Sequence, residues 1–310
     1  MPRPPEAVRR AVVPSLAKIN LDLRVLYKRA DGFHELRTIF QTISLADRIV
    51  IEYTPGRKTG LAISGNVDIP NNLILRAADA VMRETRAKGE VRFELDKRIP
   101  MGGGLGGGSS NAAAVLLALP VLLGKPIKAA KLHELAAELG SDVPFFLYGG
   151  TALGLGRGTE LYPLADATPS VRGLLIAPPV HVSTPDAYRA LNCTGGDAAP
   201  AVYFDPAKWP TQGTNDFETA VYAQHPELDR IARRLKRAGA AVVRMSGSGS
   251  SIFSVFSDVA AEATALQQFK GFPVHPVTFV TRRQYQSLWW NSLKRHTLIK
   301  VWPPLSRYEQ

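Results

Sequence analysis

The chain has 310 residues, of which 45% are hydrophobic and 21% charged, so it is too apolar for a disordered protein and long enough for about two domains. Lys and Arg number 38 against 27 Asp and Glu, and the net charge of +11 favours an anionic partner such as a nucleotide, RNA or a lipid headgroup. The single cysteine, Cys193, excludes an intrachain disulfide framework and a multi-cysteine metal site.

No segment is typical of a membrane span or an export signal. The longest apolar run, residues 112–124, is thirteen residues long, whereas a helix that crosses a bilayer needs about 20. The N-terminal region has no apolar stretch of the kind found in secretory signals. We therefore expect a cytoplasmic protein without integral membrane association.

The first half of the chain mixes strands and helices. Residues 16–25 alternate apolar and polar side chains, which predicts a strand with one face in water, and Lys18, Asn20 and Asp22 belong to that polar face. The other elements expected in this half are strands over 35–44, 47–53, 91–95 and, as a pair, 150–164, with helices over 72–87, 109–123 and 128–139.

A polar, proline-bearing stretch at 165–172 predicts a domain boundary. Strands and helices then continue without regular βαβ alternation, which favours the α+β class. The elements expected here are strands over 173–177 and 274–280, a hairpin from 241–245 and 251–256, helices over 184–191, 214–224, 226–238 and 258–269, and an irregular insert over 193–213.

The C-terminal segment 282–310 differs in composition from the rest. It contains six Lys and Arg against one Glu, and three of the four tryptophans. We interpret it as a frayed or loosely docked tail. The alternatives are docking on the body of the protein, on another subunit or at a membrane surface.

A glycine-rich loop, PMGGGLGGGSSN over residues 100–111, has six glycines in seven positions and is followed at once by an apolar helix. Glycines let the backbone approach a ligand closely, and a helix N-terminus attracts phosphate through its free N–H groups. No acidic residue lies between Asp96 and Glu134 to repel a polyphosphate. The loop lacks the Lys-Ser/Thr pair of a Walker A motif and the downstream acidic residue of a dinucleotide-binding loop.

This loop resembles the ATP-binding motif of the galactokinase, homoserine kinase, mevalonate kinase and phosphomevalonate kinase (GHMP kinase) superfamily. PSLAKINLDL over 14–23 is similar to the superfamily's first motif, and RMSGSGSSIF over 244–253 resembles its third. The resemblance implies an ATP-binding domain over 1–165, similar to domain 2 of a small-subunit ribosomal protein. A ferredoxin-like domain over 166–283 would follow, with the active site between the two domains. The resemblance covers residues 12 to about 283, and the basic aromatic tail over 284–310 has no expected counterpart in the family.

Within the superfamily, three more segments resemble the family that phosphorylates the 2-hydroxyl of 4-diphosphocytidyl-2-C-methyl-D-erythritol in the mevalonate-independent route to isoprenoid precursors. They are DGFHEL over 31–36, LGSDVPFFLYGG over 139–150 and TNDFE over 214–218. Two alternatives stay open: a kinase of the same fold for homoserine or mevalonate, and a non-catalytic nucleotide- or RNA-binding protein. The expected partners are small molecules rather than nucleic acid, and we expect a monomer or a weak homodimer.

The resemblance also implies roles for individual residues. Lys18 and Asp142 correspond to a catalytic pair, in which Asp142 orients the substrate hydroxyl and accepts its proton while Lys18 stabilises negative charge. By sequence context alone they would be a solvated strand lysine and the N-cap of a helix that starts near Pro144. His34 would recognise the cytosine ring and Phe33 would stack on it. Asn20 would lie near the reacting hydroxyl, and the second stacking residue would be Tyr188.

ATP and Mg²⁺ are the implied cofactors. Asn72 and Lys97 would border the adenine. No protein ligand of the metal is identified beyond Ser109 or Ser110, and phosphates and water can supply most of its roughly six ligands. The loop residues implied to bind ATP are Pro100, Met101, Gly102, Gly103, Gly104, Leu105, Gly106, Gly107, Gly108, Ser109 and Ser110.

Overall fold

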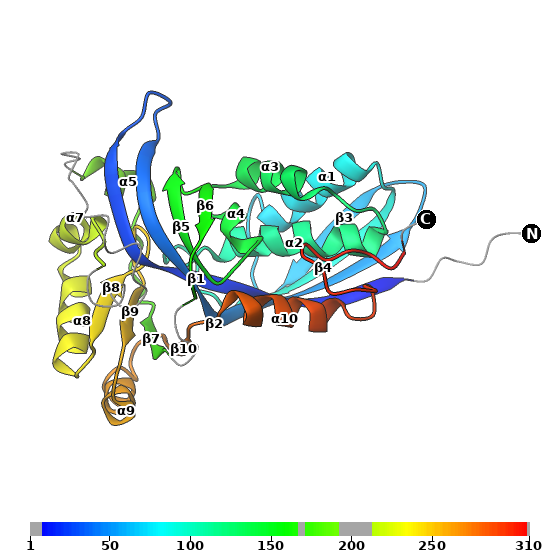
Figure 1. Cartoon of the computed structure of the whole chain (residues 1–310). Coiled ribbons are helices and arrows are strands. Elements are labelled where there is room, and N and C mark those ends of the chain that lie inside the picture. Colours follow the sequence, from blue (N-terminus) through cyan, green and yellow to red (C-terminus); the bar gives the residue numbers. More distant parts are fainter. Residues whose placement is uncertain (1–7, 167–170, 192–212, 309–310) are drawn as a thin grey trace, which may run out of the picture.

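A computed structural model of the chain describes residues 8–166, 171–191 and 213–308 (Figure 1). Cys193 and nearly all of the expected insert over 193–213 therefore lie outside the described residues, as does the middle of the predicted boundary at 165–172. The described residues form two antiparallel-rich sheets with helices around them, which confirms the α+β class.

One long hairpin is the spine of the molecule. β1 (Arg9–Lys28) pairs antiparallel with β2 (His34–Pro55) over their whole length (Figure 1). The two strands expected at 35–44 and 47–53 are therefore one, because the chain stays extended through residues 45 and 46, although the pairing with β1 shifts register there, from Leu16 opposite Ala46 to Lys18 opposite Thr42. Three register irregularities along the β1–β2 pair let so long a ribbon bend and twist.

The first sheet is built on this hairpin. Its order is β3-β4-β2-β5-β6, and β1 runs along the other edge of β2. Helices α1, α2 and α3 lie over one face of this sheet in Figure 1, and α2 is buried from Ser110 to Leu123 between β1 and its neighbouring helices. The bounds are β3 (Gly60–Gly65), β4 (Gly89–Asp96), β5 (Thr151–Gly156), β6 (Glu160–Pro163), α1 (Leu73–Thr85), α2 (Gly107–Leu123), α3 (Ala129–Leu139) and α4 (Val143–Phe146).

The second sheet has the order β10-β7-β9-β8 and is antiparallel throughout. Its core holds aliphatic residues from the strands together with residues of α5, α7, α8 and α9. A separate buried cluster, which includes Ile19, Leu175 and Phe253, joins the two sheets. The bounds are β7 (Arg172–Ile176), β8 (Val242–Met245), β9 (Ile252–Val255), β10 (Val274–Thr278), α5 (Thr184–Arg189), α7 (Phe217–Gln224), α8 (Pro226–Arg237) and α9 (Val259–Gln268).

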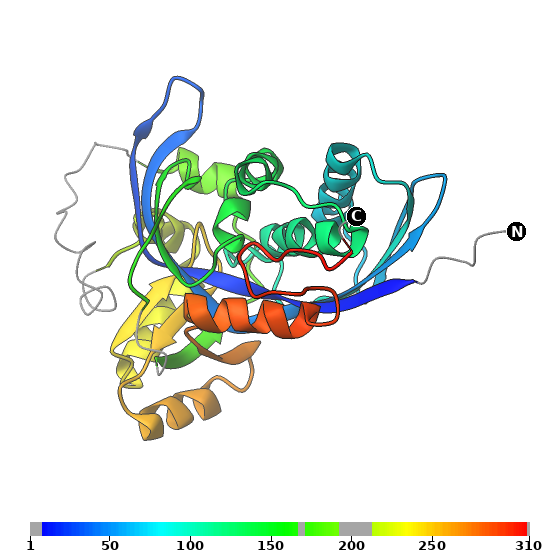
Figure 2. The same cartoon turned by 45° about the vertical axis from the view of Figure 1, so that its right-hand side comes forward.

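The C-terminal segment is not the loose tail that its composition predicts. It begins with α10 (Arg282–Leu293), which packs below β1 on the opposite side from α2 (Figure 2). Trp289 is fully buried in the core of the first sheet. The chain then crosses to the end of α2, where the Ser306 hydroxyl donates to the Val121 carbonyl at 2.7 Å and the Arg9 guanidinium lies 4.1 Å from the centre of the Tyr308 ring. The segment therefore docks on the body of its own chain.

The tryptophan side chains of this segment also contact the rest of the protein. Trp290 is partly buried and its indole N–H donates to Val301 O at 3.3 Å, whereas the Trp302 indole donates to Leu147 O at 2.9 Å. The three rings of the segment are thus held by the protein rather than presented to a membrane surface. Within the described residues, moreover, no helix combines the length and the apolarity that a bilayer crossing requires.

Candidate active site

The glycine-rich loop and the turn of the third motif pack directly on each other. A side chain on Gly104, whose φ is +75°, would place its Cβ 2.0 Å from the Ser246 carbonyl oxygen, so only glycine fits there. The Ser246 hydroxyl donates to Gly104 O at 3.0 Å, and the Ser251 N–H donates to Gly103 O at 3.3 Å. Two segments that are far apart in sequence therefore form one glycine-lined structure at the start of α2.

The side chains of this loop differ in how far they are buried. The Leu105 side chain is buried in the core between the sheets, while its carbonyl accepts from the Lys18 N–H at 3.0 Å. Ser110 is buried and its hydroxyl accepts from the Ser15 hydroxyl at 2.8 Å. Ser109 is only partly buried. Of the two serines, Ser109 is thus the one with a side chain near the surface of the loop.

A buried carboxylate that the sequence analysis missed binds groups at both ends of the glycine-rich loop. Asp47 is fully buried and accepts hydrogen bonds from the backbone N–H groups of Arg98 at 2.7 Å and Ile99 at 2.8 Å. It also accepts from the Asn111 side-chain amide at 2.9 Å and pairs with the Lys97 ammonium at 2.9 Å. Burial lowers the pKa of Lys97, and the Asp47 charge opposes that shift. Nothing in the sequence around Asp47 distinguishes it from a surface residue at a strand start.

The two residues expected beside the adenine are both engaged in protein contacts. The Lys97 ammonium is committed to Asp47 and to the Ile99 carbonyl. Asn72 is the N-cap of α1, where its side-chain oxygen accepts from the Ile74 N–H at 3.0 Å. Leu73, at the start of the same helix, lies close to Gly108. The structure therefore brings both residues to the neighbourhood of the loop, where their polar groups bind other parts of the protein.

Lys18 and Asp142 lie together at the floor of a cavity. The Lys18 ammonium is 3.3 Å from the Asp142 carboxylate, and the side chains are 4% and 32% exposed, respectively. Lys18 also donates to Asn20 Oδ1 at 2.8 Å. Asp142 is therefore the member of the pair that is more accessible to an incoming molecule.

The expectation of a wet face on the first strand is wrong. Lys18, Asn20 and Asp22 are only 3%, 2% and 2% exposed. The glycine loop covers this face so closely that a Cβ on Gly106 would lie 3.2 Å from Lys18 Cγ. Tertiary contacts that no local pattern reveals therefore convert a polar strand face into the buried base of the site.

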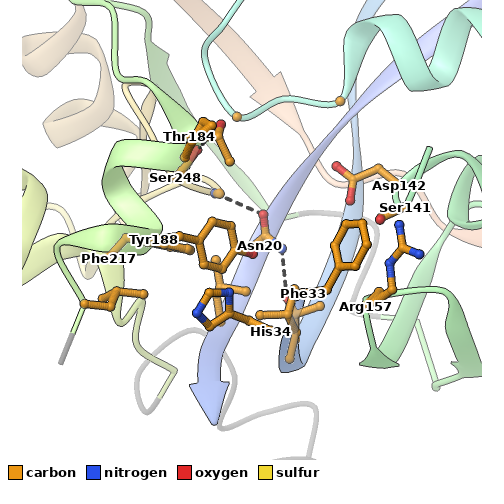
Figure 3. A pocket seen from close by; sticks show the side chains of 18 of the residues that line it. Asn20, Phe33, His34, Ser141, Asp142, Arg157, Thr184, Tyr188, Phe217 and Ser248 are labelled. Atoms are coloured by element: carbon orange, nitrogen blue, oxygen red, sulfur yellow. Dashed lines mark hydrogen bonds between the residues drawn. The ribbon is translucent and has the colours of Figure 1, made fainter. Parts of the chain in front are cut away.

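The cavity has a volume of about 930 Å³ and extends from the Lys18–Asp142 pair to a group of aromatic rings (Figure 3). It passes between the β1–β2 hairpin, the glycine loop and α5. The lining residues are Lys18, Asn20, Leu23, Lys28, Gly32, Phe33, His34, Leu36, Thr38, Phe40, Gly104, Gly106, Ser141, Asp142, Arg157, Thr184, Pro185, Tyr188, Arg189, Leu191, Phe217, Gly247 and Ser248. All catalytic and substrate residues expected from the sequence are among them.

The aromatic end has two sides, with Phe33 facing Tyr188 across the cavity in Figure 3. The His34 ring stacks on Tyr188 with centroids 4.6 Å apart and an interplanar angle of 22°, and Phe217 meets Tyr188 edge-on at 4.9 Å. Burial lowers the pKa of His34, and the neighbouring Lys28 charge adds to the shift. At neutral pH the imidazole is therefore uncharged, with one donor and one acceptor nitrogen.

Arg157 is a second residue that the sequence analysis missed. It lies in the turn between β5 and β6, and its guanidinium carbon is 3.5 Å from the centre of the Phe33 ring (Figure 3). Such a stacked guanidinium fixes the ring while its remaining N–H groups stay free to bind an anion or a carbonyl. The segment GLGRGTE offers no local signal for this role, because the contact is made across two elements.

The metal-binding capacity of the described residues is small. No group of three or more His, Cys, Asp or Glu side chains in these ranges could hold an ion. A metal that arrives with a polyphosphate needs few protein ligands, because phosphate oxygens and water fill most of its coordination sphere. The partly exposed Ser109 hydroxyl is an oxygen donor of the kind such a metal accepts, so the site fits an ion that arrives with the nucleotide.

The chain matches two family descriptions, GHMP kinases N terminal domain over residues 72–150 and GHMP kinases C terminal over residues 209–271. A 4-diphosphocytidyl-2-C-methyl-D-erythritol kinase of Solibacter usitatus is 49% identical over 311 residues, which span 97% of this chain and 98% of that protein. The enzyme of the same name from Geobacter sulfurreducens is 37% identical, over 85% of this chain and 96% of its own length.

Solved structures agree with these relatives. A crystal structure of a 4-(cytidine 5'-diphospho)-2C-methyl-D-erythritol kinase matches with a TM-score of 0.76 at 37% identity and covers 86% of this chain and 98% of that one. Homoserine kinase from Cytophaga hutchinsonii matches with a TM-score of 0.66 at 20% identity, over 89% of this chain and 96% of its own. The latter likeness concerns the fold alone.

Proposed function

The chain belongs to the 4-diphosphocytidyl-2-C-methyl-D-erythritol kinase family of GHMP kinases, and we propose that its cavity transfers the γ-phosphoryl group of ATP to the 2-hydroxyl of that substrate. The observation that carries the proposal is the position of the Lys18–Asp142 pair, at 3.3 Å, on the floor of a cavity whose far end is aromatic. A reacting hydroxyl and a nucleobase on one substrate would use both ends.

At the reacting end, Asp142 accepts the proton of the 2-hydroxyl while the hydroxyl oxygen bonds to the γ-phosphorus of ATP. The bond from that phosphorus to the bridging β,γ-oxygen breaks, and ADP leaves. The buried Lys18 ammonium holds the Asp142 carboxylate in place and stabilises negative charge that develops on the transferred group. The backbone N–H groups at the start of α2 are the donors available to the ATP phosphates.

Mg²⁺ would bind together with ATP. Ser109 is the side chain that would hold it, and it would neutralise charge on the phosphate oxygens. Ser109 is proposed for this role rather than Ser110, because the Ser110 hydroxyl is buried against Ser15.

At the aromatic end, the cytosine ring would lie between Phe33 and Tyr188. Stacking on an aromatic face contributes about 1–3 kcal/mol per base. A neutral His34 can both donate to and accept from the polar edge of cytosine, which a protonated imidazole could not do. Homoserine and mevalonate have no ring to occupy this end, so the aromatic group favours the cytidine substrate over these alternatives.

The test is ADP release by the wild-type protein with ATP and Mg²⁺. Turnover is expected with 4-diphosphocytidyl-2-C-methyl-D-erythritol and not with homoserine or mevalonate. Calorimetric titration should also detect CDP binding in the absence of ATP. Turnover on one of the other alcohols, or no heat with millimolar CDP while ATP still binds, would reject the assigned substrate. RNA binding with a steep salt dependence and no turnover on any alcohol would support the non-catalytic alternative.

Replacing Arg157 by alanine should raise the KM for the cytidine substrate by about 5- to 10-fold, because a cation–π contact contributes about 0.5–2 kcal/mol and also holds Phe33 in place. The KM for ATP and kcat should change less than twofold. Steady-state kinetics with each substrate varied in turn make the comparison. Arg157→Lys keeps the charge but not the planar group and is the matched variant. Its KM for the cytidine substrate should lie between those of the wild-type protein and Arg157→Ala. An unchanged KM for the cytidine substrate in Arg157→Ala would remove Arg157 from the site.

The finer expectations on assembly and location remain predictions. They are a monomer or weak homodimer, a cytoplasmic location and no nucleic-acid partner, and sedimentation and RNA titration would test the first and the last. The boundaries of the two domains, 1–165 and 166–283, are likewise a proposal.

A further inference from the structure

A short segment before α7 is hydrogen-bonded to the same strand that carries Lys18. The Leu23 N–H donates to Thr214 O at 2.8 Å, and the Asp216 N–H donates back to Leu23 O at 3.0 Å. The Thr214 N–H also donates to the Asp22 carboxylate at 2.7 Å. The segment 214–216 is therefore fixed against β1, although it belongs to the part of the chain that builds the second sheet.

Asn215, in the middle of this segment, points toward the turn of the third motif. Its side chain is buried, with the residue only 4% exposed. Its amide nitrogen donates to the carbonyls of Met245 and Gly247, both at 2.8 Å, and its oxygen accepts from the Phe217 N–H at 3.0 Å. Both hydrogens of the amide are thus used to hold the turn that begins after β8.

This turn also contacts β1, the strand that carries Lys18 and Asn20. The Gly247 N–H donates to Asn20 Oδ1 at 3.0 Å, and the same oxygen accepts from the Lys18 ammonium at 2.8 Å (Figure 3 labels Asn20, and dashed lines mark its hydrogen bonds). Asn20 Nδ2 donates to the Thr38 hydroxyl at 2.7 Å, and that hydroxyl donates to the Asp22 carbonyl at 2.6 Å. The Asn20 amide therefore cannot rotate without losing bonds on both of its sides.

We propose that Asn215 is a positioning residue of this kinase, which fixes Gly247 and through it the Asn20 amide that directs the Lys18 ammonium at Asp142. The inference rests on the proposed function, since it assigns a role in the step that Lys18 and Asp142 perform. Asn215 does not line the cavity and touches neither member of the pair, so its effect must pass through Gly247 and Asn20. The segment thereby couples the second sheet to the reacting end of the site.

The variant Asn215→Asp tests this role, because it keeps the size and the acceptor for Phe217 but replaces the two donated hydrogens with an oxygen that faces two carbonyls. We expect kcat to fall about tenfold, in line with the loss of buried hydrogen bonds, while KM for ATP and for the cytidine substrate changes less than about twofold. A role in folding alone would lower Tm and leave kcat per folded molecule at the wild-type value.

Asp216→Asn is the matched control. The Asp216 carboxylate accepts from the Val25 N–H at 2.8 Å and pairs with Arg24 at 3.4 Å, so it anchors the same segment to β1 without touching the turn. This variant should lower Tm and keep kcat. In a double-mutant cycle, Asn215→Asp should add less than about twofold to the loss caused by Asn20→Ala, because both act on one path. Full additivity, or a wild-type kcat in Asn215→Asp, would overturn the proposal.

A crystal structure of Asn215→Asp tests the inference without turnover. The bond between the Gly247 N–H and Asn20 Oδ1 should be lost and Lys18 displaced from Asp142, whereas retention of both contacts would contradict the proposal. If the wild-type protein does not phosphorylate the cytidine substrate, the proposed function fails, and this structure still decides whether Asn215 positions Lys18.

Discussion

Asp142→Asn is expected to lower kcat by about 10³-fold, since a positioned general base contributes roughly 10²- to 10⁴-fold and an amide cannot accept the proton of the hydroxyl. The substitution keeps the size of the side chain, and an amide oxygen can still accept from the Lys18 ammonium, which lies 3.3 Å from the Asp142 carboxylate in the wild-type protein. ATP affinity should therefore be retained. Single-turnover measurement of ADP formation separates this effect from product release.

Asp79→Asn provides the comparison for Asp142→Asn. Asp79 forms an exposed ion pair with Arg83 on α1 and does not line the cavity, so its variant should retain wild-type turnover. A kcat for Asp142→Asn within about tenfold of the wild-type value would show that the carboxylate is not the base. The phosphate loop would then remain as a nucleotide site whose acceptor is activated by another group.

Trp289→Ala is expected to reduce the free energy of unfolding by about 3–5 kcal/mol, the usual range for removing a buried aromatic side chain from a core. Trp289 is fully buried on α10, with its ring centroid 6.3 Å from that of Tyr285. The Tyr285 hydroxyl donates to Phe146 O at 2.5 Å, on the short helix that follows Asp142. Urea unfolding followed by circular dichroism measures the loss.

Trp290→Ala is the paired control for this helix. Its ring is only partly buried, so the variant should lose less than about half as much unfolding free energy. In both variants the folded fraction should keep the wild-type kcat, because neither ring lines the cavity. A loss below about 1 kcal/mol for Trp289→Ala would mean that the C-terminal segment is not docked as described.

The local patterns were sufficient for the elements that depend on neighbouring residues. The Asn72 cap starts α1, the run of apolar residues after the glycine loop forms α2, and β8 and β9 form the expected hairpin. In each case the relevant contacts lie within one element or one turn. The alternation over 16–25 likewise predicted a strand, but it assigned Lys18 to water.

Sequence alone determined the family, the fold class and the candidate residues of the site, through the motifs at 14–23, 100–111 and 244–253 and their order. Only the tertiary structure decided which polar groups are buried and what each one contacts. Asn20 and Gly247 bond across 227 positions, and Asp47 holds a loop some 50 residues further along, as its bonds to Arg98 and Ile99 at separations of 51 and 52 show. The docking of α10 likewise depends on a core that forms from the other end of the chain. Hydrogen bonds and packing over such separations have no periodicity in the sequence, because they arise only when distant elements meet in space.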